Sequence, residues 1–147
     1  MIPRPVEVLI ACFGFAAMAA HADTLKSEAD LKPFADKVMA ATVKSGLESG
    51  FALMRPYLVI PEAEVQNVML KSRAQRDETA ARYGKSIGYE FIGRRKLGDS
   101  LVRLTYIEKT ERHALPWMFH FYQTRNGWIL DSFLWNDRAS ELFNMAP

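Results

Sequence analysis

The clearest hydrophobic pattern in this chain runs from Trp117 to Trp135. Apolar residues recur there on both sides of Asn126-Gly127, and an Asn-Gly pair between such segments is the strongest short-range signal for a β-hairpin. Both faces of the predicted hairpin are apolar, so neither face can be left in water. We therefore expect one face to pack on the chain's own helices and the other to meet a partner, a lid or a ligand.

A turn at Asn126-Gly127 fixes the register and assigns each side chain of the hairpin to a face. One face carries Trp117, Phe119, Phe121, Trp128, Leu130 and Leu134. The other face carries Met118, His120, Tyr122, Ile129, Asp131, Phe133 and Trp135. In this register Tyr122 lies opposite Asp131, and His120 lies one pair along.

A second hairpin is predicted upstream, because apolar residues also alternate on both sides of Gly98-Asp99. Its register places Phe91 opposite Tyr106 on the face that should join the core. On the other face it places Arg94 opposite Arg103, a pair that repels unless an acidic residue lies nearby.

The first half of the chain follows a helical period instead. An apolar stripe over positions 31–42 ends before Gly46, which can take the left-handed conformation that terminates a helix. A shorter helix over 47–54 should end before Pro56, and a third helix should open at Pro61.

The third helix loses its apolar stripe after Leu70. Residues 71–82 are therefore expected to form either a solvated helix or a mobile loop. After the last strand, a final short helix is expected, with Leu142 and Phe143 turned inward.

Helices followed by strands predict the α+β class, with helices on one face of an antiparallel sheet. The expected architecture is N-terminal helices packed on a curved four-stranded meander, followed by the short C-terminal helix. A chain of 147 residues is one domain's worth. We assign residues 23–147 to this single domain.

Residues 1–22 have the layout of a secretory signal peptide. An apolar run from Val8 to Ala20 leads into the A-x-A sequence Ala20-His21-Ala22. The run is too short to span a membrane, so we expect a cleaved leader, no membrane anchor and a periplasmic or secreted protein. The alternative, lipidation of Cys12, would leave a hydrophobic N-terminus in place of a polar tether.

The composition of the chain argues against several kinds of functional site. Cys12 is the only cysteine, so its loss with the leader would exclude disulfides, thiol catalysis and thiolate metal sites. The formal net charge of +2 gives no strong field toward nucleic acid. Because no two histidines stand at ligand spacing, we expect neither a metal site nor another cofactor.

The order of elements resembles the nuclear transport factor two-like superfamily, within the broader cystatin-like α+β folds. The resemblance covers Leu31 to Phe143. It is carried by the first helix ending at Lys44-Ser45-Gly46, by Phe51-Ala52-Leu53-Met54 before Pro56, and by the hairpin Trp117-x-Phe119-x-Phe121-Tyr122 with Gly127-Trp128-x-Leu130. It implies a bent sheet wrapped around a helix to form a cone with a cavity, and pairing of two copies through the outer sheet face. The superfamily contains isomerases, dehydratases and binding modules, so this fold does not fix the function.

Candidate catalytic residues are His120, Tyr122 and Asp131, which share one face of the last hairpin. An imidazole, a phenol and a carboxylate could together polarise a carbonyl group and move a proton. The same trio could instead form a structural hydrogen bond at a dimer interface or a sheet edge.

Candidate ligand-binding residues are Arg103, Glu108, Tyr106 and Trp135. A strand arginine near an apolar cavity could hold a carboxylate or a phosphate. An outer-face arginine that is solvated or ion-paired is the competing interpretation.

These features favour a non-enzymatic function: an exported binding or protein-interaction module that dimerises through its sheet. One alternative is a small enzyme with isomerase-like or dehydratase-like acid–base chemistry, or a binder of a small apolar ligand, that uses the cone. Another is an inhibitor or modulator of a second exported protein.

Overall fold

The structure, a computed structural model, describes residues 22–145. The expected signal peptide therefore lies almost entirely outside the described residues. Helices α1 (Leu31–Ser45), α2 (Leu47–Met54) and α3 (Glu62–Tyr83) precede strands β1 (Ser86–Leu97), β2 (Leu101–Thr110), β3 (Ala114–Thr124) and β4 (Gly127–Trp135). Short 3₁₀ turns are η1 (Glu28–Asp30), η2 (Arg55–Tyr57) and η3 (Ala139–Asn144).

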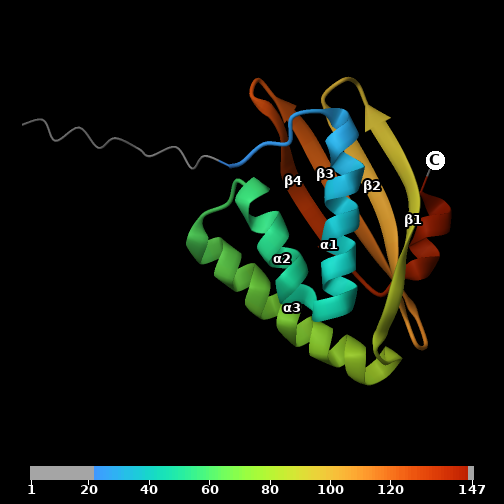
Figure 1. Ribbon diagram of the computed structural model, residues 1–147. Helices are drawn as coiled ribbons and strands as arrows, with labels where there is room; N and C mark the ends of the chain where they lie inside the picture. The colour runs from blue at the N-terminus through green and yellow to red at the C-terminus, as the bar shows by residue number, and fades with distance from the viewer. Residues whose placement is uncertain (1–21, 146–147) are drawn as a thin grey trace, which may run out of the picture.

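The four strands form one antiparallel sheet in the order β1-β2-β3-β4. The helices α1 and α2 cover one face of this sheet, and η3 lies on its other side (Figure 1). The predicted α+β class, with helices packed on a four-stranded meander and a short C-terminal helical segment, is confirmed. We call the sheet face under the helices the inner face and the opposite one the outer face.

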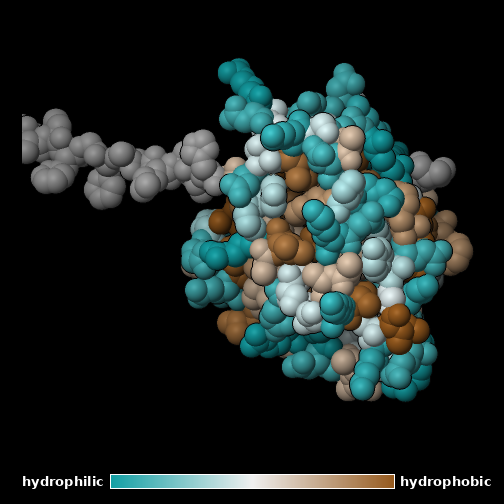
Figure 2. All heavy atoms as spheres, in the orientation of Figure 1, coloured by the Kyte–Doolittle hydropathy of each residue, from teal (hydrophilic) through white to brown (hydrophobic). Residues whose placement is uncertain are grey.

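The predicted apolar stripe of α1 is the one that packs on the sheet. Its buried residues are Leu31, Phe34, Ala35, Val38, Met39 and Thr42. Helix α2 crosses α1 closely at Gly50, where an added Cβ would lie 1.9 Å from the Thr42 Oγ1. The side chains that α1 and α2 turn to solvent are mostly hydrophilic, with scattered apolar ones between them (Figure 2).

Helix α3 continues without a break through residues 71–82, so the solvated-helix alternative holds and the mobile-loop alternative does not. Only Val65 and Thr79 are buried along its 22 residues. A helix with so little apolar contact needs another attachment, and Arg76 provides one, as described below.

The inner face of the sheet carries a dense aromatic core. Its fully buried members include Tyr106, Trp117, Phe119 and Phe121. The Trp117 ring stacks on Trp135, with ring centroids 6.1 Å apart and an interplanar angle of 18°. Aromatic packing of this kind contributes more than its buried area alone.

A β-bulge between Phe91 and Gly93 changes the predicted register of the first hairpin. Phe91 does pair with Tyr106, but beyond the bulge Arg95, not Arg94, lies opposite Arg103. Arg94 instead lies opposite Leu104 and forms an ion pair with Glu28. The prediction was wrong because it assumed a turn at Gly98-Asp99 alone and a strict period of two, whereas the turn holds residues 98–100 and β1 has one extra residue.

A further bulge, in β4 at Asp131, changes the predicted faces of the last hairpin. Phe121 pairs with Leu130 whereas His120 pairs with Ser132, so Asp131 is the extra residue. The register slip sends every later side chain of β4 to the opposite face from the one expected. Phe133 and Trp135 thus join the core, and Leu134 is on the outer face.

The tight turn of this hairpin is Arg125-Asn126, one residue earlier than expected, because Gly127 already pairs with Thr124. Gly127 has φ 134°, and an added Cβ would lie 2.6 Å from the Leu25 carbonyl oxygen. Glycine is therefore required where Leu25 exchanges two backbone hydrogen bonds with Trp128 and covers part of the β4 edge.

The C-terminal segment differs from expectation in one respect. It is a 3₁₀ turn, and Phe143 is 92% exposed, so Phe143 does not turn inward. Between residues 22 and 145 the structure shows no helix that is both long and apolar enough to cross a membrane.

Candidate functional site

Among residues 22–145, the inner side of the sheet holds one fully buried charge, the carboxylate of Glu108, which is inaccessible to solvent. Arg76 of α3 donates to both of its oxygens, one of them at 2.8 Å, and the Trp117 Nε1 donates to it at 2.9 Å. The Arg76 guanidinium lies 5.3 Å from the centroid of the Trp135 ring. This cluster joins α3 to the sheet.

Two expected ligand-binding residues, Glu108 and Trp135, thus lie inside the protein and contact its own residues. A third, Tyr106, is also fully buried and donates a hydrogen bond to the Asp36 Oδ1 at 2.8 Å. Burial raises the pKa of Tyr106 far above its ordinary value, and the bond to Asp36 raises it further. The phenol therefore stays neutral and joins β2 to α1.

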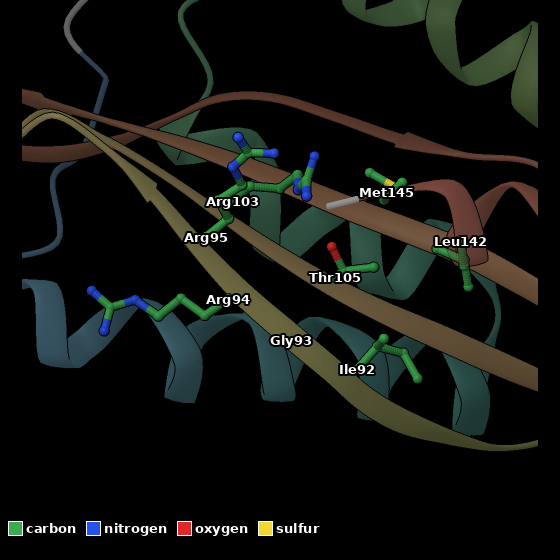
Figure 3. A pocket seen from close by; sticks show the side chains of 8 residues that line it. All are labelled: Ile92, Gly93, Arg94, Arg95, Arg103, Thr105, Leu142 and Met145. Atoms are coloured by element: carbon green, nitrogen blue, oxygen red, sulfur yellow. The ribbon is translucent and has the colours of Figure 1, made fainter. Parts of the chain in front are cut away.

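The fourth expected ligand-binding residue, Arg103, lies on the outer face of the sheet. The β1–β2 pairing sets Arg95 directly across from it. Both side chains extend to one side of the sheet, the side of η3, whereas Arg94 extends away from them (Figure 3). The bulge in β1 makes this possible, because it moves Arg95 onto the outer face.

The two arginines separate two hollows of the outer face. The first has a volume of about 280 Å³, and its walls include Ile92, Thr105, Leu142 and Met145 (Figure 3). The second has a volume of about 360 Å³, and its walls include Leu97, Leu101, His120 and Asp131. Arg95 and Arg103 line both hollows. We call the two hollows together the outer groove.

The guanidinium of Arg103 lies in an unfavourable environment. Its Nε is buried and has no hydrogen-bond partner among the described residues. Burial lowers the pKa of Arg103, and the neighbouring charge of Arg95 lowers it further. Since arginine keeps its proton in proteins, the groove holds two positive charges that form no ion pair with any described residue.

His120 faces Arg103 across the β2–β3 pair. Its Nδ1 lies 3.1 Å from the Ser132 Oγ. Burial lowers the pKa of His120, the charge of Arg103 lowers it further, and Asp131 opposes both effects. The imidazole is therefore neutral at neutral pH and adds no third positive charge.

Of the expected catalytic trio, the structure brings His120 and Asp131 to the same hollow. Tyr122 lies on the same outer face but pairs with Ile129, not with Asp131. Within the described range, no hydrogen bond joins any two of the three. Residues 22–145 also contain no group of three or more His, Cys, Asp or Glu side chains placed to hold a metal ion.

Sequence reasoning missed two features. Arg76 stands in a polar stretch without periodicity, so nothing marked it as the partner of Glu108. The stack of His113 on Tyr83, with ring centroids 4.2 Å apart, was also not expected. The Tyr83 hydroxyl donates to the Asp137 Oδ2 at 3.0 Å, and these contacts fasten the end of α3 to the C-terminal segment.

Comparison of the chain with family models, curated proteins and solved structures found no match in any of the three.

Proposed function

We propose that this protein is an exported, non-enzymatic interaction module of the nuclear transport factor two-like, cystatin-like kind. It works through the outer face of its sheet, where a second copy of the chain is the favoured partner. The layout of residues 1–22 supports export to the periplasm or the exterior, and the order of elements supports the family likeness.

The observation that carries the proposal is the difference between the two sheet faces. The inner face is occupied by the protein's own aromatic core. The outer face keeps large apolar side chains partly in water: Leu97 is 55%, Leu101 43%, Tyr122 43% and Leu134 40% exposed. Several large apolar side chains exposed on one face are typical of protein–protein contact sites, and a self-complementary face suits a two-fold dimer.

The same difference weighs against a catalytic cone. Tyr106, Glu108 and Trp135 would line such a cone, and their polar atoms and ring faces are engaged by Asp36, Arg76 and Trp117. An enzyme would need a reachable reaction space beside these groups. His120 and Asp131 border a hollow on the outer face instead, which favours a role in binding.

Sedimentation velocity of residues 23–147 tests the dimer. We expect a dimer at tens of micromolar and a monomer for Leu101→Lys, because the new positive charge, beside Arg95 and Arg103, would be buried without a partner at the contact. The control is Leu53→Lys on α2, since Leu53 is 41% exposed but lies on the helix side. A wild-type monomer, or a dimer that survives Leu101→Lys and dissociates with Leu53→Lys, would overturn the proposal.

A further inference from the structure

The outer groove contains a charge arrangement that the protein does not balance itself. Arg95 and Arg103 are opposite one another on adjacent strands, and like charges in such a pair repel. No ion pair to either arginine is present in the part of the chain that the structure describes. A buried guanidinium nitrogen without an acceptor is unfavourable as well. An anion from outside would relieve both conditions.

We propose that Arg95 and Arg103 form a receptor for the carboxylate of a small amphiphilic ligand, whose apolar chain lies along the outer groove. The inference rests on the proposed use of the outer face for binding, but it does not require the homodimer. The planar guanidinium donates two parallel hydrogen bonds to a carboxylate, which accounts for the choice of arginine at both positions.

The shape of the groove fits an elongated ligand. Its two hollows, of about 280 Å³ and about 360 Å³, extend to opposite sides of the arginine pair. Each is near the lower end of the range of small-molecule sites, roughly 300–1,000 Å³. Ile92, Leu142 and Met145 supply apolar walls on one side, and Leu97 and Leu101 supply them on the other.

The remaining polar groups restrict the charge of the ligand. Asp131 borders the larger hollow and repels a second negative charge there. His120 is neutral at neutral pH and does not compensate for that repulsion. A single carboxylate therefore suits the groove better than a doubly charged phosphate monoester.

Isothermal titration of residues 23–147 with decanoate tests the receptor. We expect saturable binding that weakens about tenfold or more in Arg103→Gln and in Arg95→Gln, because each variant removes a charge-assisted contact. The matched control is Arg73→Gln on α3, which lines neither hollow and is paired with Glu48. It removes the same charge and should bind decanoate as the wild type does.

Three further ligands separate the contributions of the apolar chain and of the charge to binding. Acetate should bind more weakly because it lacks the chain, 1-decanol because it lacks the charge, and decyl phosphate because of its second charge. The receptor is wrong if decanoate does not bind, if decanol binds equally well, or if Arg73→Gln weakens binding as much as Arg103→Gln. Circular dichroism melting of each variant excludes unfolding as the cause of a loss.

Sedimentation of the same samples keeps this inference apart from the proposed function. If the protein is a monomer and binds decanoate, the receptor is supported and the homodimer is contradicted. If the protein is a dimer and does not bind decanoate, the receptor is contradicted and the homodimer is supported.

Discussion

Glu108 is a residue whose burial follows from the sequence but whose partner does not. The alternation along β2 places it on the core face, and a charged residue there needs a partner. Its partner, Arg76, lies 32 positions earlier on a helix whose polar sequence shows no stripe. Sequence reasoning could mark Glu108 as unusual, but only the tertiary structure reveals that an internal cation satisfies it.

The Arg76–Glu108 pair leads to a stability prediction. Glu108→Gln leaves the mostly buried Arg76 charge unbalanced and should lower the free energy of unfolding by about 3–5 kcal/mol. Replacing both residues, as Arg76→Met with Glu108→Leu, should cost much less, because no unpaired charge remains. Urea denaturation of the three proteins measures the difference, and equal losses in the single and double variants would refute the account.

The lowered pKa of His120 leads to a prediction about how the stability of the protein depends on pH. Its pKa is lowered in the folded protein from the ordinary value of 6.5. As the pH falls through 6.5, the unfolded chain takes up a proton that the folded protein resists, so stability falls until the folded pKa is passed. His120→Gln should lack this component.

The test compares urea midpoints between about pH 8 and about pH 5.5, a range that spans the ordinary histidine pKa. At the upper end the imidazole is neutral in both states, so the two proteins there differ only through the lost contacts. An equal acid-side loss of stability in the wild type and in His120→Gln would contradict the prediction.

At the scale of elements, periodicity located the helices and strands but could not locate the bulges. One extra residue in β1 brings Arg95 instead of Arg94 opposite Arg103, and one in β4 exchanges the faces of Leu134 and Trp135. In β4, which is apolar on both faces, a bulge leaves no mark in the alternation. The composition of the outer groove depends on the bulge in β1, which brings Arg95 opposite Arg103, and for that reason it could not be read from the sequence.

The crossing of α1 and α2 gives a prediction at this scale. Alanine normally favours a helix over glycine, but at Gly50 its Cβ would clash with the Thr42 Oγ1 and approach the Val38 carbonyl oxygen to 3.1 Å. Gly50→Ala should therefore destabilise the protein by about 1–3 kcal/mol, as overpacking does.

Thermal unfolding measures this effect, and Gly93→Ala is the control, because nothing lies within 4 Å of a Cβ added there. Adding Thr42→Ala to Gly50→Ala should recover part of the loss, since it removes the nearest atom. Stabilisation by Gly50→Ala alone would show that the helices do not cross as closely as described.

At the scale of the whole molecule, the order of helices and strands sufficed to predict the α+β class, because each layer must cover the apolar face of the other. The sequence also indicated that the last hairpin is apolar on two sides. It could not show which side is closed by the protein itself. In the structure the inner side is filled by the core, and the outer side has the arginine pair and the partly exposed leucines.

The central claim is that the outer face is covered when the protein functions, and solvent exposure of methyl groups tests it most directly. In a single copy Leu53, Leu101 and Leu134 are almost equally exposed, at 41%, 43% and 40%. A soluble gadolinium chelate should therefore broaden their methyl NMR signals equally if the protein stays alone. We predict that at tens of micromolar the Leu101 and Leu134 signals are protected relative to Leu53, whereas equal broadening of all three would contradict the account.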